Sequence, residues 1–378
     1  MFPAGAGGGW SEINQVDEPW WSAARLREVE HRDFVSRATA AYRLGDAVLQ
    51  IDVDDPALLE GFVRLYGDCA VPAPSASDGS AVRCTMRRSF EPQLVVLTFQ
   101  TGAPADAAAA AYHLLRPTQA VPPFRVWDSV DSGWRLVGGS TGPVLAARGA
   151  QVLMHPKLIP AEFLVEYLVG ITLGAQTGML PIHGAALRMG EAGVVLVGAS
   201  HAGKTTTSLH LAARGHSLLS DEIAVIRLAT REVVPFRRAV NVRPGPVGQE
   251  LAAVLGLSGD EDGSASSPQW ARWHRITEVF PGPPACPAPL QAVFFLAGFA
   301  DQATMEPFQL DLDRPDVFAW ITAPEISFCS WGVAPSRRAL RLLVLKQALS
   351  RTPCWLVKVG PPQETVELIE RTVEELSC

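Results

Sequence analysis

Residues 194–207 read VVLVGASHAGKTTT and join two segments of different periodicity. Residues 194–197 are apolar and mostly β-branched, which predicts a short buried strand. Residues 205–213 keep apolar side chains on one helical face and are followed by Arg214-Gly215, which predicts a helix and its end. Between them lies the pattern G-x-x-x-x-G-K-[ST], matched by Gly198, Gly203, Lys204 and Thr205. A strand, a glycine-rich turn and a helix in this order predict an α/β core.

This context predicts a phosphate-binding loop. Glycines let the backbone curl so that N–H groups point at phosphate oxygens, at the positive end of the helix dipole. Lys204 is expected to lie near solvent, reaching the β- and γ-phosphates, and the Thr205 hydroxyl is expected to ligate Mg²⁺. A strand-to-helix turn that binds nothing is the alternative. The residues expected to contact a nucleotide are Gly198, Ala199, Ser200, His201, Ala202, Gly203, Lys204, Thr205 and Thr206.

Two adjacent acids follow the loop after one helix length. Asp221 comes 17 residues after Lys204 (221 − 204) and is followed by Glu222. That interval fits one helix, a tight turn and the start of a strand, so both acids are expected beside the loop. A carboxylate there can ligate Mg²⁺ or take a proton from an attacking hydroxyl. We expect Asp221 to be a catalytic base and metal ligand, and Glu222 a metal ligand. A solvated acidic turn is the alternative.

Composition excludes several classes of protein. The net charge of −7 without a long basic run disfavours nucleic acid as a partner. The longest apolar stretch, residues 290–300, is too short to span a bilayer, and residues 1–10 lack the apolar segment of a signal peptide. Six scattered cysteines form no C-x-x-C pair. We therefore expect a cytoplasmic protein without a nucleic-acid or membrane partner.

At 378 residues the chain is long enough for two domains. Residues 1–30 are expected to form an arm, residues 31–155 an α+β N-terminal domain, and residues 156–378 the domain that holds the phosphate loop. Within the N-terminal domain, strands are expected at 47–53, 93–100, 124–128, 134–137 and 151–154, and helices at 57–66 and 105–115. Later elements are expected at 162–176, 182–189, 223–228, 290–300, 337–350, 354–359 and 362–376, with a low-complexity segment at 258–268.

One further sequence feature is a histidine ahead of the loop, in a predicted hairpin. The ordered set is His183-Gly184, the phosphate loop, a helix ending Arg214-Gly215-His216, and Asp221-Glu222. Through this set, residues 178–226 resemble the catalytic core of the HPr kinase/phosphorylase family. More weakly, residues 234–245 and 354–376 resemble more divergent relatives of this family, some of which phosphorylate serine on precursor peptides, as lasso-peptide kinases do. The resemblance implies a P-loop core like that of phosphoenolpyruvate carboxykinase, with ATP and Mg²⁺ as cofactors.

The chain departs from the family pattern at three positions. His201 stands where the family usually has glycine, Thr206 replaces a glutamate, and Glu222 replaces the second aspartate of the acid pair. Residues 1–150 do not resemble the bifunctional enzymes of the family. The resemblance implies that His183 hydrogen-bonds Asp221 or the γ-phosphate, although a histidine among apolar neighbours is more often a core residue.

Together these features predict an ATP- and Mg²⁺-dependent kinase that transfers the γ-phosphate to a hydroxyl. The expected acceptor is a serine of a peptide or protein, and a homo-oligomer is compatible with the sequence. A kinase for a small metabolite and a non-catalytic nucleotide-binding regulator are the alternatives. An arginine is expected to stabilise the transferring group. The candidates are Arg238, Arg243, Arg272 and Arg275.

Overall fold

The computed structural model describes residues 34–74, 81–88, 95–99, 125–128, 134–139, 142–148, 151–154, 161–176, 178–257, 271–282, 285–310 and 343–377. The arm at 1–30, the helix expected at 105–115 and the segment 258–268 lie outside them.

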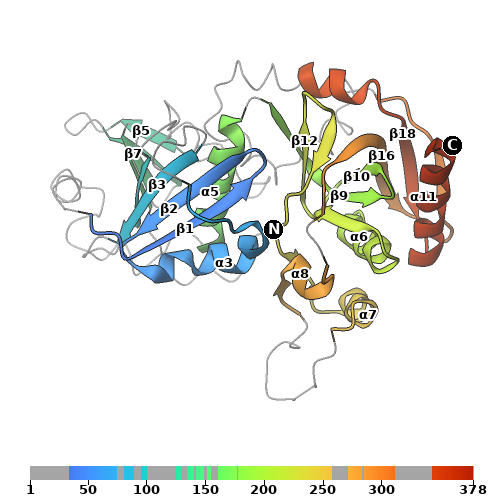
Figure 1. The fold of residues 1–378 in the computed structure, drawn as a ribbon, viewed down its shortest axis with the longest axis horizontal. Coiled ribbons are helices and arrows are strands. Elements are labelled where there is room, and N and C mark those ends of the chain that lie inside the picture. The colour runs from blue at the N-terminus through green and yellow to red at the C-terminus, as the bar shows by residue number, and fades with distance from the viewer. Residues whose placement is uncertain are drawn as a thin grey trace. The chain divides into compact units, whose positions relative to one another are not determined.

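The described chain divides into two compact units (Figure 1). Unit 1 takes in the described residues of Met1–Gly61 and Val71–Gln176. Unit 2 takes in those of Phe62–Ala70, Thr177–Ile326 and Ser336–Cys378. The boundary expected at 155/156 lies earlier than this division, since helix α5 (Ala161–Ala175) groups with unit 1.

Unit 1 contains an eight-stranded sheet in the order β1-β2-β3-β4-β8-β7-β6-β5. Among the strand pairs that the structure describes in this sheet, β2 with β3 is parallel and the others are antiparallel. The sequence predicted five of these strands. It missed β1, β3 and β7, which are rich in alanine or arginine or begin with Gly-Pro, residues that are uncommon in strands. The strands are β1 (Ala38–Leu44), β2 (Ala47–Val53), β3 (Ala81–Arg88), β4 (Val95–Phe99), β5 (Arg125–Asp128), β6 (Arg135–Gly139), β7 (Gly142–Arg148) and β8 (Gln151–Met154).

The helix expected at 57–66 begins as a 3₁₀ turn, η2 (Pro56–Leu59), and continues as α3 (Glu60–Tyr66). The Asp55 side chain accepts a hydrogen bond from the Ala57 backbone N–H at 3.0 Å, which satisfies a free donor at the start of the turn. Although the sequence placed this helix in the N-terminal domain, residues 62–70 group with unit 2.

Unit 2 contains a mixed sheet in the order β10-β9-β12-β13-β16-β18-β17, with β11 added to β9. β16 pairs with β13 at its start and with β10 along most of its length. β10, β16 and β18 run parallel, so their carboxyl ends lie at one edge of the sheet. The strands are β9 (Met179–Met189), β10 (Ala192–Gly198), β11 (Ser217–Ser220), β12 (Ile223–Arg227), β13 (Glu232–Val234), β16 (Ala288–Phe299), β17 (Thr304–Pro307) and β18 (Cys354–Val359).

Helices α6 (Lys204–Ala213) and α11 (Pro362–Ser377) pack on one face of this sheet and against each other. Their shared core includes Leu196, Leu209, Phe294, Val359 and Ile369. The opposite face is covered by the helical residues 343–349, part of the helix expected at 337–350. Since both faces of the parallel strands are covered, β10 reads as a continuous apolar run.

The described part of unit 2 also contains two shorter helices, α7 (Pro246–Val254) and α8 (Ile276–Val279), and a strand pair, β14 (Val240–Asn241) with β15 (Trp273–His274). The segment 62–70 holds this part of the chain in place. Leu65 O accepts a hydrogen bond from Ala239 N at 2.7 Å, and the Asp68 carboxylate accepts from both the N–H and the hydroxyl of Thr277.

Candidate active site

The motif segment adopts the strand, loop and helix that its sequence predicts. β10 ends at Gly198, the loop follows, and α6 begins at Lys204. Gly203 precedes the helix at φ 93°, a left-handed conformation that favours glycine. A β-carbon on Gly198 would lie 2.8 Å from Leu296 O on β16, so only glycine lets the two backbones approach there. The loop therefore begins at the carboxyl edge of the parallel strands, where α/β sheets bind ligands.

The tip of the loop is open to solvent. Ala199, Ser200 and His201 are exposed, whereas Ala202 is buried and donates its N–H to Ala199 O at 3.1 Å. His201 has φ 65°. A side chain in the left-handed region costs on the order of 1 kcal/mol, which explains why glycine suits this position better. The exposed imidazole lies on the loop that would surround the phosphates. Thr206, in the first turn of α6, is half-buried.

Lys204 does not lie near solvent, contrary to what its place in the motif predicts. The residue is only 8 % exposed, and its ammonium group donates hydrogen bonds to Gly198 O and Ala199 O, each at 2.9 Å. The expectation that the side chain lies near solvent was wrong, because the loop carbonyls draw the cation inward. The ammonium group thus bridges two carbonyl groups of the loop. From this position the Lys204 side chain can rotate toward phosphate oxygens.

Thr205 and Asp221 lie in direct contact. The Thr205 hydroxyl lies 3.0 Å and 3.1 Å from the two carboxylate oxygens of Asp221 and donates to them. Asp221 comes directly after β11, which adds to β9, and β9 also pairs with β10. The sheet thereby brings the acid beside the first helical turn after the loop, as the spacing along the chain predicted.

Asp221 has an unusual electrostatic environment for a carboxylate. It is 3 % exposed. Burial, reinforced by the negative charge of Glu222, raises the pKa of Asp221 from 3.8 to about 6, against the opposing effects of Thr205 and Arg238. A carboxylate with a raised pKa is a stronger base once ionised and still ionises at neutral pH. Buried acids with such shifts are concentrated at functional sites.

The Glu222 side chain contacts an arginine, Arg238, rather than the loop. Its carboxylate accepts a hydrogen bond from the Arg238 guanidinium at 2.5 Å. Arg238 is buried, and its guanidinium lies 4.5 Å from the ring centroid of Trp273. The backbone of Glu222 has φ 64°. This strained turn separates the side chains of the two adjacent acids, so that Asp221 contacts Thr205 and Glu222 contacts Arg238.

His183 lies beside the acid pair along the sheet. It pairs in register with Ile223, and the next residue, Gly184, donates its N–H to Glu222 O at 3.1 Å. The histidine is buried. A β-carbon on Gly184 would collide with Leu196 O of β10, so only glycine fits directly after His183. The histidine, the acids and the loop therefore meet at the carboxyl end of β10, beside the middle of β9.

Among the four candidate arginines, the structure brings Arg238 to the acid pair. Arg275 instead forms an ion pair with Glu278 in α8, with Nε 2.9 Å from the carboxylate. Arg243 and Arg272 are exposed. Sequence reasoning could not rank the four because the contact depends on residues 62–70 and on Trp273, which hold the chain around Arg238 in place.

The oxygen ligands at the site suit Mg²⁺. The Thr205 hydroxyl and the Asp221 carboxylate are hard oxygen donors within 3.1 Å of each other. Among the described residues, no group of three or more His, Cys, Asp or Glu side chains is arranged to hold a metal ion alone. Mg²⁺ usually takes one or two protein oxygens and completes its shell with phosphates and water. Thr205 and Asp221 are the residues that would hold it.

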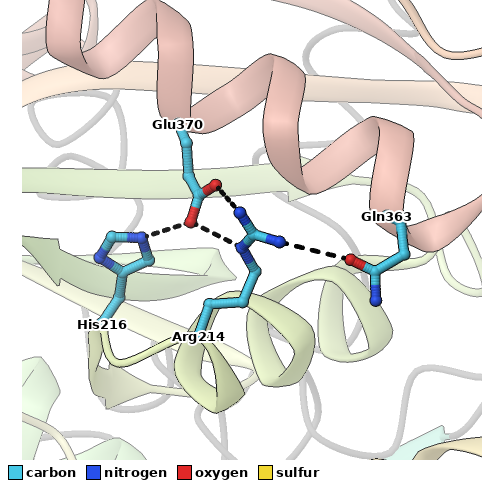
Figure 2. Close-up of polar contacts among 4 residues, drawn as sticks. All are labelled: Arg214, His216, Gln363 and Glu370. Atoms are coloured by element: carbon cyan, nitrogen blue, oxygen red, sulfur yellow. Dashed lines mark hydrogen bonds and ion pairs between the residues drawn. The ribbon is translucent and has the colours of Figure 1, made fainter.

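The Arg-Gly-His segment after α6, residues 214–216, contacts the C-terminal helix α11 through Arg214 and His216. Glu370 of α11 accepts hydrogen bonds from Arg214 Nε at 3.0 Å and Nη2 at 2.7 Å, and its carboxylate lies 2.9 Å from His216 Nε2 (Figure 2). Arg214 also donates to Gln363 at 3.4 Å. These contacts fasten the C-terminal helix to the end of α6 and thereby support the helix that begins at the phosphate loop.

Replacing Glu370 by glutamine is expected to lower Tm by on the order of a few degrees at pH 7, because the forked ion pair with Arg214 is lost. Partial burial raises the pKa of Glu370, but hydrogen bonds from Arg214 and His216 outweigh it and hold the pKa below 4.5. A lowered pKa means that the stabilisation is present above pH 4.5 and disappears as the pH falls through the folded-state value. Thermal unfolding across this range checks it, with exposed Glu374→Gln as the control; equal effects of the two changes would contradict it.

Comparisons with known proteins add little to this geometry. No protein-family model matches the sequence, and no curated protein matches it. Among solved structures, the chain is similar to the HPr(Ser) kinase/phosphatase from Coxiella burnetii, with 13 % identity over 52 % of this chain and 88 % of that chain and a TM-score of 0.26. At these values the similarity shows neither a shared fold nor a shared activity, so the geometry of the site has to support the function.

No helix in the described part of the chain combines the length and the apolar character that a bilayer crossing requires.

Proposed function

We propose that this protein is an ATP- and Mg²⁺-dependent kinase that transfers the γ-phosphate to a hydroxyl, most simply that of a serine in a peptide or protein. The observation that carries the proposal is the contact between Thr205 and Asp221 directly after the loop that contains Lys204. It joins a hydroxyl suited to Mg²⁺, a buried acid of raised pKa and a phosphate-binding loop at one point.

Each residue has a distinct task in this proposal. Backbone N–H groups of residues 198–206 bind the phosphates, and the Lys204 ammonium group leaves the loop carbonyls to neutralise charge on the transferring group. Thr205 and Asp221 would hold the metal ion, which would supply positive charge to stabilise the phosphate oxygens. The ionised Asp221 carboxylate takes the proton of the attacking hydroxyl, and His183 orients Asp221 or the γ-phosphate.

Arg238 supplies a second positive charge next to the acids. Glu222 accepts a hydrogen bond from Arg238, so either Arg238 turns toward the transferring group when ATP binds, or Glu222 keeps it oriented. The half-buried Trp273 under Arg238 lies between Arg272 and Arg275, and this basic and aromatic segment, residues 271–275, is a candidate for acceptor contacts. A kinase for a small-metabolite hydroxyl uses the same groups and differs only in its acceptor.

The direct test is mass spectrometry of candidate serine peptides after incubation with the protein, ATP and Mg²⁺. Addition of one phosphate to a peptide supports the proposal. Phosphate transfer to a small metabolite alone would assign the metabolite kinase. Tight ATP binding without transfer to any acceptor, and without ATP hydrolysis, would leave the nucleotide-binding regulator.

Exchange of Glu222 for glutamine tests the second acid. The negative charge of Glu222 raises the pKa of Asp221, so its removal should lower that pKa and move the acidic limb of the kcat/KM profile below pH 6. The measurement is the pH profile at two Mg²⁺ concentrations. A defect that higher Mg²⁺ relieves would assign Glu222 to the metal shell, as its sequence position suggests. An unchanged profile would contradict both roles.

A further inference from the structure

One large apolar side chain beside the loop is exposed. Phe299, the last residue of β16, is 69 % exposed, whereas Phe294 and Phe295 in the same strand are buried. A single exposed apolar residue is common on protein surfaces and needs no explanation by itself. The position and the orientation of Phe299 are what distinguish it.

A β-bulge sets the orientation of Phe299. Leu296 pairs with Val357 and Phe299 with Val359, so that two residues of β16, Ala297 and Gly298, oppose one residue of β18. Gly298 has φ 105°, which the bulge requires. Side chains alternate between the faces of a strand, so a regular strand would place Phe299 on the face opposite to Leu296. The extra residue instead returns it to the face that holds α6.

The bulge brings the ring to the phosphate loop. A β-carbon built on Gly203 would lie 3.6 Å from Cε1 of the Phe299 ring and 3.7 Å from a methyl carbon of Val359. Gly203 is the last loop residue before α6, so the aromatic side chain borders the loop while most of its surface remains open to solvent.

The turn after Phe299 is tied down. Ala300 donates its N–H to Val359 O at 2.9 Å, and Ala303 donates its N–H to the Glu364 carboxylate of α11 at 3.2 Å. Gly360 touches the backbone of this turn so closely that no β-carbon would fit there. An exposed ring on a fixed backbone loses little conformational entropy when it binds a flat ligand.

The order of the strands indicates how a bound nucleotide would be oriented along the edge of the sheet. β10, which leads into the loop, lies between β9 on one side and β16 on the other. Thr205, Asp221 and His183 define the β9 side as the place for the metal ion and the γ-phosphate. A nucleoside triphosphate with its γ-phosphate on the β9 side would extend its base past the loop toward β16 and β18. Phe299 is the last residue of β16.

We propose that Phe299 is the surface on which the base of the bound nucleotide stacks. The proposal rests on the nucleotide binding proposed above and adds the place of the base. Aromatic side chains bind bases through their π-faces with little dependence on base identity, so Phe299 supplies affinity for a nucleotide over inorganic polyphosphate rather than a choice between purines.

The test compares ATP with inorganic tripolyphosphate, which has the phosphates but no base, each titrated calorimetrically with Mg²⁺ present. Phe299→Ala should weaken ATP binding about ten-fold, within the range of base–aromatic stacking, and leave tripolyphosphate binding unchanged. Phe299→Trp should keep the ATP affinity, and its added fluorescence relative to the unaltered protein should respond to ATP and not to tripolyphosphate.

Three outcomes would overturn the assignment. Unchanged ATP affinity in Phe299→Ala places the base elsewhere, and equal losses for both ligands mean that the ring only supports the loop. If the unaltered protein binds neither ligand, the nucleotide-binding proposal itself fails, which is distinguishable from the first two results. Should Phe299→Ala not fold, Phe299→Leu keeps an apolar side chain without an aromatic face and should show the same selective loss.

Discussion

Replacement of Asp221 by asparagine is expected to lower turnover by roughly 10²–10⁴-fold, because the amide keeps the shape of the side chain but cannot accept the proton of the attacking hydroxyl. In the unaltered protein, kcat/KM should fall as the pH drops below about 6, where Asp221 becomes protonated. Single-turnover assays across pH 5–8 measure both effects, with the exposed Asp46→Asn as the control. Unchanged turnover in Asp221→Asn would remove the proposed mechanism.

The same substitution should make the nucleotide-free protein more stable. Burial raises the folded-state pKa of Asp221 from 3.8 to about 6, so the ionised form is less favourable in the folded protein than in the unfolded chain. The cost is absent below pH 3.8, grows between pH 3.8 and about 6, and is complete above that range. An asparagine side chain carries no charge and avoids this cost. A Tm for Asp221→Asn that exceeds the unaltered value at pH 8 but not at pH 4 would confirm that stability is lost at this site in favour of activity.

Loss of the Lys204 side chain is the second change with a large expected effect. Lys204→Ala should lower turnover by at least about 10²–10³-fold, since the ammonium group is a positive charge held at the loop by Gly198 O and Ala199 O. It should also lower Tm by on the order of 5 °C, because the ammonium group joins Gly198 O and Ala199 O across the loop. A lysine near solvent, as the sequence predicts for Lys204, would cost little stability when replaced.

The test of Lys204 measures turnover and Tm separately, because the side chain is expected to contribute to both. Lys346, which is exposed on the helical segment 343–349, is the matched control: Lys346→Ala should leave turnover unchanged and lower Tm by less than Lys204→Ala does. Near-normal turnover in Lys204→Ala would show that the loop does not act on phosphate. A normal Tm with lost turnover would mean that the two carbonyl contacts contribute little to folding.

The elements close to the loop could be predicted from the sequence, because each has a local signal. The apolar, mostly β-branched run at residues 194–197 was enough to predict a strand. The helical periodicity and the glycine at 215 were enough to predict α6 and its end. The interval from Lys204 to Asp221 fixes one helix, one turn and one short strand. Since these elements are neighbours both in the chain and in space, the contact between Thr205 and Asp221 follows from spacing.

Other parts of the site carried weaker signals or none. The Gly298-Phe299 pair at the end of a predicted strand is typical of a bulge, and it could have been noticed in the sequence. Glu370 looks like any other acid on the polar face of an amphipathic helix. Arg238 looks like three other arginines. Nothing local distinguishes these two, because their partners are 156 and 16 residues away.

By itself the sequence determined the strand, loop and helix of the phosphate-binding motif, the nearness of the acid pair and the mixed use of helices and strands. Only the tertiary structure decided that Lys204 is buried, that Glu222 contacts Arg238 rather than the loop, and that residues 62–70 belong with unit 2. The physical reason is that periodicity reports which face of an element is buried. It does not report which distant element covers that face, since this depends on strand register and packing across the whole chain.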